Sequence, residues 1–191
     1  MGSVEAPRRA RVSRRTSETE VELELNLDGT GSHRVATGVG FFDHMLSLWA
    51  FHASFDLELR ARGDLEVDAH HTVEDVGLCL GRALNEALGD RAGICRYGHA
   101  VLPMDEALVL VAADLGGRPY LAFNVPFPAA RVGDFDTELV AEFFRAVTGQ
   151  AGLTLHLHLL GGRNAHHICE ALFKGCGRAL REAVRRGGSG I

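Results

Sequence analysis

The sequence predicts an α+β protein: an internally duplicated two-layer α/β sandwich, each half a mixed four-stranded sheet with two helices on one face. Three observations predict this class. His-His-x-x-Glu occurs at residues 70–74 and again at residues 166–170, an offset of 96 residues. The same offset relates residues 81–84 to residues 177–180. Strand-like and helix-like segments precede each copy in a similar order. We therefore expect one domain over residues 1–191, made of two halves at about residues 10–92 and 93–187.

The first half opens with a pattern typical of strands. Apolar and polar residues alternate in residues 21–27, which predicts a half-buried strand. Residues 28–31 supply a turn, and residues 33–39 are expected to return as the second strand of a hairpin. Residues 41–52 carry apolar side chains with few breakers and predict a helix.

The same two periods predict the rest of the first half: a strand at residues 55–61, a short strand at residues 65–67 and a helix at residues 72–88. Thr72 and Asp75 resemble a capping box for that helix.

The second half repeats this order. We expect strands at residues 107–114, 118–125 and 153–159, and helices at residues 137–147 and 165–186. Short connections leave no linker between the halves.

Composition limits the class of partner. The net charge of −5 gives no global reason to bind nucleic acid or an anionic membrane, and 46% hydrophobic residues suffice for a buried interior. We interpret the arginine-rich first 15 residues as a solvated arm. Without a signal peptide or an apolar run near the ~20 residues of a membrane span, the protein is expected to be cytoplasmic. The cysteines lack C-x-x-C spacing and are expected to be reduced core residues: Cys79, Cys95, Cys169 and Cys176.

The repeated motif indicates metal binding. Residues i and i+4 share one helix face, so His70 with Glu74, and His166 with Glu170, can each chelate a cation. The second histidine of each pair lies about 100° further round its helix and must point elsewhere. A single copy is explained well by a polar helix start; two copies in register favour ligands. Imidazole and carboxylate without thiolate suit manganese, iron or zinc, and a six-coordinate preference favours manganese.

Extending the duplication adds two ligand candidates. Aligning residues 49–50 with residues 147–148 places His44 opposite Glu142, an offset of 98. Two matching quartets result: His44, His71, His166 and Glu170, mirrored by Glu142, His167, His70 and Glu74. Closure within one chain and closure across subunits both remain open.

Other polar residues are weaker candidates. His52, at the end of the first helix, is expected either to hold substrate or to fill a core or capping position. Arg96, Arg118 and Lys174 are candidates for a phosphate clamp. Lys174 is the only lysine among the 20 Lys and Arg residues. His156 and His158 alternate with apolar residues, as a solvent-facing strand row does.

Four segments carry a family resemblance: residues 40–46 (GFFDHML), 68–75 (DAHHTVED), 103–106 (PMDE) and 162–167 (GRNAHH). With them the chain resembles the imidazoleglycerol-phosphate dehydratases from residue 15 to residue 181. The resemblance implies a lyase of histidine biosynthesis that converts D-erythro-imidazole glycerol phosphate to imidazole-acetol phosphate. It also implies two Mn²⁺ per active site and a homo-oligomer of 24 subunits.

The resemblance further implies a mechanism. The substrate's imidazole is held between two metal ions as an imidazolate, whose electron density expels the adjacent hydroxyl. A diazafulvene-like intermediate then makes the C2 proton removable, and the resulting enol tautomerises. Glu18 is the expected acid/base for that proton.

The resemblance assigns the remaining roles. The expected catalytic residues are Glu18, Glu170, His71 and His167. The expected metal ligands are the eight members of the two quartets. The expected substrate-binding residues are Glu18, His44, His52, His70, His71, Glu74, Arg96, Arg118, His166, His167, Lys174 and Ser189. Two features bear on how the chain fits the family. Position 142, which can be His or Glu in the family, is Glu here. The Ser-Thr-Lys-Gly segment common at the family's C-terminus is replaced by residues 187–191 (GGSGI), which leaves Ser189 and backbone amides for the phosphate.

Two other functions are compatible with a doubled metal motif. A dinuclear metallohydrolase is expected to have an Asp-rich ligand set, and the His-dominated set argues against it. A non-enzymatic metal-buffering or metal-sensing assembly would not need Lys174, Arg96 and Arg118 near the metals.

Overall fold

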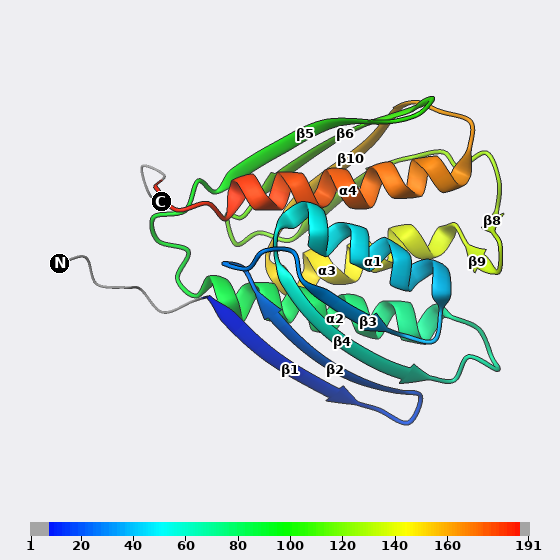
Figure 1. Cartoon of the computed structure of the whole chain (residues 1–191), viewed down its shortest axis with the longest axis horizontal. Coiled ribbons are helices and arrows are strands. Elements are labelled where there is room, and N and C mark those ends of the chain that lie inside the picture. Colours follow the sequence, from blue (N-terminus) through cyan, green and yellow to red (C-terminus); the bar gives the residue numbers. More distant parts are fainter. Residues whose placement is uncertain (1–7, 188–191) are drawn as a thin grey trace.

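The computed structural model describes residues 8–187, which fold into two four-stranded sheets, four helices and one small hairpin (Figure 1). The first sheet has the order β1-β2-β4-β3 and contains β1 (Arg9–Arg15), β2 (Thr19–Asn26), β3 (His33–Ala36) and β4 (Asp56–Gly63). The second has the order β5-β6-β10-β7 and contains β5 (Tyr97–Met104), β6 (Ala107–Asp114), β7 (Tyr120–Asn124) and β10 (Thr154–Gly161). The helices are α1 (Gly40–Ala53), α2 (His70–Leu88), α3 (Glu138–Ala151) and α4 (Ala165–Ala183). The hairpin is β8 (Arg131–Val132) and β9 (Phe135–Asp136).

The helices lie between the two sheets (Figure 1). Helix α2 packs on β1 and β2 while α1 contacts β3, and in the other half α4 packs on β5 and β6 while α3 contacts β7. The halves meet through their helices, α1 against α4 and α2 against α3. All four helices begin at the same end of the molecule in Figure 1. The structure therefore confirms the predicted duplicated sandwich with two helices on one face of each sheet.

The pairing of the strands gives the sequence offset between the two halves strand by strand, whereas the motif gives only one offset. Leu23 pairs with Leu59 at the centre of the first sheet, and Val111 pairs with Leu157 at the centre of the second. The step from Leu23 to Val111 is 88 residues, whereas the step from Leu59 to Leu157 is 98. The β8–β9 hairpin lies within the longer interval.

Two glycines allow the helices to touch. A Cβ added at Gly81 of α2 would lie 2.4 Å from the carbonyl oxygen of Val147 in α3, and one added at Gly177 of α4 would lie 2.6 Å from that of Trp49 in α1. These contacts explain why the motif repeats glycine at this place: each copy marks a close crossing of two helix backbones.

The outer faces of the two sheets differ in chemistry. In β2 the apolar residues face the core and Glu20, Glu22 and Glu24 face outward. The outer face of the second sheet instead exposes large apolar side chains, each more than half accessible: Tyr97, Val101, Tyr120 and Leu160. Within the described range, no helix is both long and apolar enough to cross a membrane.

The predicted hairpin of residues 21–27 and 33–39 is wrong. Strand β4 lies between β2 and β3, antiparallel to the first and parallel to the second. A parallel pair needs a crossover, and α1 supplies it between β3 and β4. Residues 65–67 form a turn rather than a strand, in which the Val67 N–H donates to the Asp64 carbonyl at 2.8 Å.

The N-terminal prediction of a solvated arm is wrong in one respect, because residues 9–15 form a strand, although their arginines are solvent-exposed. From Arg9 the chain forms β1, an edge strand paired with β2 along its whole length. The outward-facing arginines are exposed, but Arg14 Nε lies 2.8 Å from Asp75 Oδ1. The strand at residues 97–104, β5, was not predicted, because Pro103 and Gly98 interrupt its pattern.

The predicted capping box of Thr72 and Asp75 is wrong as well. Helix α2 begins two residues earlier, at His70, whose N–H donates to Asp68. Thr72 is buried, and Asp75 accepts from Arg14 and Thr19 instead. Helix α4 ends at Ala183 rather than residue 186.

The cysteine prediction holds for three of four residues. All four thiols are free; Cys79, Cys169 and Cys176 are buried, whereas Cys95 is partly exposed. Burial raises the pKa of Cys79 to about 11 and the pKa of Cys169 and Cys176 to about 12.

Candidate metal centre

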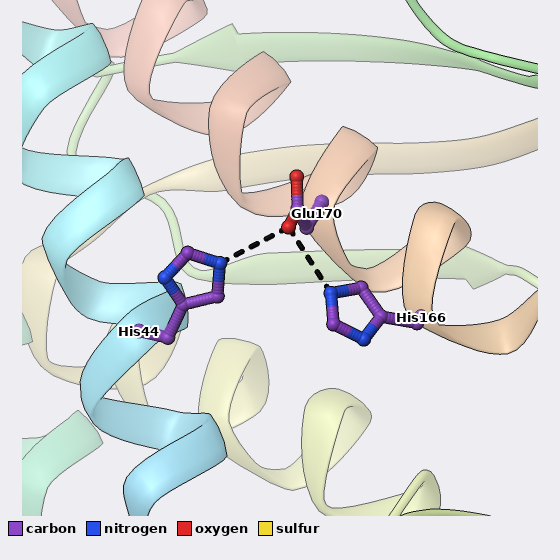
Figure 2. A group of neighbouring side chains, drawn as sticks. All are labelled: His44, His166 and Glu170. Atoms are coloured by element: carbon purple, nitrogen blue, oxygen red, sulfur yellow. Dashed lines mark hydrogen bonds and ion pairs between the residues drawn. The ribbon is translucent and has the colours of Figure 1, made fainter.

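Three predicted ligands from two helices converge on one point (Figure 2). Glu170 Oε1 lies 3.0 Å from His44 Nε2 and 3.1 Å from His166 Nε2. His44 is on α1 and the other two are one turn apart on α4, so the α1–α4 packing assembles the group. One ligand atom from each residue lies within 4.8 Å of the others. Two imidazole nitrogens and a carboxylate oxygen at this spacing fit a borderline divalent cation.

Local interactions hold this group in place. The side chain of Asn164 accepts from the N–H groups of His166 and His167 and so caps α4. The Phe41 ring stands edge-on to His166 with a centroid distance of 5.2 Å. The sequence Asn-Ala-His-His therefore fixes the helix start, and Phe41 of α1 packs against the His166 ring.

Lys174 provides the charge that balances Glu170. Its Nζ lies 2.5 Å from Glu170 Oε2 and 3.5 Å from Met104 Sδ. The side chains of Glu170 and Lys174 are 9% and 17% exposed. Burial alone would raise the pKa of Glu170, but hydrogen bonds from Lys174, His44 and His166 outweigh it and lower the pKa to about 2.

The residues of the second quartet lie further apart than those of the first. His70 Nε2 lies 3.9 Å from Glu74 Oε2 on α2, and both side chains are nearly half exposed. Glu142 forms an ion pair with Arg145 of its own helix. Of the four members of the second quartet, therefore, only His70 and Glu74 are neighbours.

The second histidine of each pair points elsewhere, as the helical rotation predicts. His71 Nδ1 lies 2.9 Å from Asp64 Oδ2 and 4.0 Å from Glu18 Oε2. The hydrogen bond to Asp64 raises the pKa of His71.

His167 has the corresponding arrangement in the second half. Its Nδ1 lies 2.7 Å from Glu106 Oε2, and its Nε2 lies 3.6 Å from Asp105 Oδ2. Glu106 raises the pKa of His167. That same hydrogen bond, with backbone N–H groups, lowers the pKa of Glu106 to about 2.

Neither quartet closes among residues 8–187 of one chain. Three members of the first quartet meet, and its fourth, His71, contacts Asp64. Two members of the second meet, while Glu142 and His167 have other partners.

The three cations predicted to clamp phosphate do not converge in one chain. Arg96 Nε lies 2.7 Å from Asp114 Oδ1, and Arg118 approaches the same carboxylate at 4.0 Å. Lys174 contacts Met104, at the far end of the 8-residue strand β5. At about 3.3 Å per residue the two ends are roughly 23 Å apart.

His52 is half-buried at the end of α1. Burial, together with the charges of Lys174 and Arg178, lowers the pKa of His52. Its position near Lys174 is compatible with the predicted substrate contact. Ser189 lies outside the described residues.

Sequence reasoning missed Asp64 and Glu106. The first lies between two predicted strands and was given no role, and the second was interpreted only as part of a family segment. A carboxylate that follows a strand ending beside a histidine pair is a signal that could have identified Asp64.

Comparisons with known proteins give one consistent result. A family model described as imidazoleglycerol-phosphate dehydratase matches residues 37–180. A Desulforudis audaxviator protein named imidazoleglycerol-phosphate dehydratase is 60% identical over 178 residues, covering 93% of this chain and 91% of that protein. A Desulforamulus reducens protein of the same name is 58% identical over 179 residues, covering 94% and 91%.

Two solved structures share the fold. The imidazoleglycerol-phosphate dehydratase of Staphylococcus aureus N315 superposes with a TM-score of 0.85 at 42% identity, covering 93% of this chain and 99% of that chain. The Pyrococcus furiosus structure, a complex with (S)-C348, gives a TM-score of 0.81 at 38% identity, covering 92% and 94%.

Proposed function

The chain belongs to the imidazoleglycerol-phosphate dehydratase family, and from this premise we propose that it dehydrates D-erythro-imidazole glycerol phosphate to imidazole-acetol phosphate in histidine biosynthesis. The observation that carries the proposal is the convergence of His44, His166 and Glu170 on one point. Their spacing suits a cation that binds an imidazole ligand, and the same motif recurs 96 residues away.

The proposed active site holds two Mn²⁺ ions. His44, His166 and Glu170 would hold one ion, with His71 as the fourth ligand; His70, Glu74, Glu142 and His167 would hold the other. A bound divalent ion supplies positive charge that favours the deprotonated form of an imidazole beside it. Lys174 lies against Glu170 Oε2, so Oε1 is the oxygen that faces His44 and His166.

The protein's own residues would position the substrate and move its proton. Glu18 lies in the turn before β2 with its side chain 52% exposed, and Oε2 is 4.0 Å from His71 Nδ1. A carboxylate that reaches solvent beside the ligand histidines is suitable to take the C2 proton and return a proton to the product. Lys174, Arg96 and Arg118, with His52 and Ser189, would bind the phosphate end.

This assignment requires more than one copy of the chain. Each quartet is incomplete within a chain, and Arg96 is separated from Lys174 by the length of β5. The apolar outer face of the second sheet, with Val101 and Leu160 exposed, is suited to association between copies. We propose a homo-oligomer, of 24 subunits by the family resemblance, that acts in the cytoplasm on a small phosphate substrate without a nucleic-acid or membrane partner.

A direct assay tests the function. The metal-free protein is reconstituted with Mn²⁺, incubated with imidazole glycerol phosphate, and assayed for the enolisable ketone by its absorbance in alkali. We expect ketone formation that depends on the metal. Metal binding with no ketone, alongside phosphate release from generic esters, would favour a metallohydrolase. Metal binding with neither reaction would favour a metal-buffering assembly.

A variant pair ties the activity to the centre. Glu170→Gln is expected to lose both bound metal and turnover, because an amide is a weaker ligand than a carboxylate. The matched control is Glu86→Gln on the exposed face of α2, which removes only a surface ion pair with Arg82 and should keep full activity. Full activity in Glu170→Gln would contradict the proposed ligand.

A further inference from the structure

We infer that Asp64 and Glu106 are positioning residues that fix the ring orientation and tautomer of His71 and His167, so that each histidine presents a bare Nε2. The inference rests on the proposed function in one respect, that the presented nitrogen binds a divalent ion. The two carboxylates come from unrelated places in the duplicated fold.

Glu106 lies in the turn between β5 and β6 and has three hydrogen-bond partners at the start of α4 and just before it. Its Oε2 lies 2.7 Å from His167 Nδ1, while its Oε1 accepts from the backbone N–H groups of Arg163 at 3.2 Å and Asn164 at 2.7 Å. An ionised carboxylate only accepts hydrogen bonds, so His167 Nδ1 must carry the proton. The lone pair of His167 is therefore on Nε2, on the side of Asp105.

Asp64 acts in the same way on His71. It follows the last residue of β4, and its Oδ2 lies 2.9 Å from His71 Nδ1. Its side chain is 19% exposed, and its other oxygen, Oδ1, is buried without a hydrogen-bond partner. The bond to His71 is thus the main polar contact of a largely buried carboxylate, which gives the ring a defined orientation.

Strand register shows that the two carboxylates are not duplicates of each other. The step of 88 residues that relates β2 to β6 makes Glu18 the counterpart of Glu106. The step of 98 that relates β4 to β10 makes Gly162 the counterpart of Asp64.

Because Asp64 has no carboxylate counterpart in the second half, the contacts of Glu18 differ from those of Glu106. By symmetry Glu18 would bind the Nδ1 of His71 as Glu106 binds that of His167, but Asp64 occupies that position and Glu18 stays 4.0 Å away. That distance is beyond hydrogen bonding. Because Asp64 binds His71, the Glu18 carboxylate remains available to exchange a proton with the substrate. Both oxygens of Glu106, in contrast, accept hydrogen bonds within the protein.

The tautomers can be measured without turnover. Metal-free protein labelled with ¹⁵N in its histidine rings is sedimented and studied by magic-angle-spinning NMR at pH 9, where imidazole is neutral; His→Asn variants assign the signals. We expect protonated Nδ1 and bare Nε2 for both His71 and His167. A protonated Nε2 at either ring in the wild-type protein would overturn the inference for that ring.

Variants at Glu106 separate positioning from a merely structural role. Glu106→Leu is expected to change the His167 tautomer and weaken Mn²⁺ binding, measured by calorimetry, by roughly 10- to 100-fold. Glu106→Gln keeps an acceptor oxygen and should retain the tautomer. In a His167→Asn background, Glu106→Leu should cause no further loss of Mn²⁺ affinity. A further loss there, or an unchanged tautomer in Glu106→Leu, would contradict the inference.

Variants at Asp64 must allow for Glu18 as a replacement acceptor. Glu18→Leu alone should leave the His71 signals unchanged, whereas the Asp64→Leu, Glu18→Leu double variant should lose the protonated Nδ1. Retention in the double variant would overturn the role of Asp64. Because these signals come from metal-free protein, a failure of the dehydratase assay with the expected tautomers would reject the proposed function and leave the positioning role standing.

Discussion

Lys174 Nζ lies 2.5 Å from Glu170 Oε2, so the only lysine of the chain contacts the same carboxylate that His44 and His166 contact through Oε1. Both members of the pair are largely buried, one turn apart on α4. An ionised carboxylate at such a depth needs compensating charge. The structure therefore assigns the lysine a balancing role in the metal-free protein.

Lys174→Met should destabilise the metal-free protein by about 1–3 kcal/mol, because it leaves a buried carboxylate with less compensation. Saturating Mn²⁺ should reduce that loss, since the cation replaces the missing charge. Urea unfolding with and without Mn²⁺ measures both effects. The matched control is Arg82→Met, which removes an exposed i,i+4 ion pair with Glu86 and should cost less than about 0.5 kcal/mol. Equal losses in the two variants would contradict the balancing role.

Acid should destabilise the protein through Glu170 and Glu106, whose pKa values fall from 4.5 to about 2 on folding. A lowered folded-state pKa means that the unfolded chain binds more protons between these values. The stabilisation is thus present above about pH 4.5 and lost as pH falls towards about 2.

Glu170→Gln tests this dependence. Near pH 3 it should reduce the proton uptake on unfolding by about one proton per molecule. The measurement is the slope of the free energy of unfolding against pH, from denaturant titrations in the metal-free protein. Parallel curves for wild type and Glu170→Gln would contradict the pKa assignment.

The predictions from sequence succeeded where the determining contacts are periodic or repeated. Alternation in residues 21–27 identified β2, and the offset of 98 residues identified His44 as a partner of the α4 motif. Strand neighbours were missed because pairing is non-local: β2 and β3 are separated in the sheet by a strand that follows α1. Periodicity contains no information about that order.

The partners of His71 and His167, two proposed ligands, were missed for a similar reason. Glu106 and His167 are 61 residues apart in sequence, on different elements that meet only after the sheet and α4 pack. Asp64 lies near His71 in sequence, but its role depends on how the turn after β4 folds.

Metal binding should depend on the assembled group. In the wild-type protein Mn²⁺ should raise the unfolding midpoint, and at 100 times the Kd it should add about 2.7 kcal/mol of stability. His44→Asn and His166→Asn should each lower Mn²⁺ affinity at least about tenfold, whereas His33→Asn, at the exposed start of β3, should not. Calorimetric titration measures the affinities, and chelation should reverse the thermal shift. An unchanged affinity in both ligand variants would contradict a centre at His44 and His166.

The helix crossings predict a contrast between two glycine substitutions. Gly177→Ala places a Cβ 2.6 Å from the carbonyl oxygen of Trp49, a backbone atom of a packed helix that cannot move alone. We expect the free energy of unfolding to fall by about 1–3 kcal/mol from overpacking.

The matched control is Gly149→Ala in α3, where an added Cβ meets nothing within 4 Å. It should instead stabilise the protein by about 0.5–1 kcal/mol, because alanine favours the helix. Denaturant unfolding compares the two, and Gly81→Ala should repeat the loss at the equivalent crossing with Val147. If Gly177→Ala were as stable as Gly149→Ala, close backbone contact would not explain why the duplicated motif keeps glycine at this place.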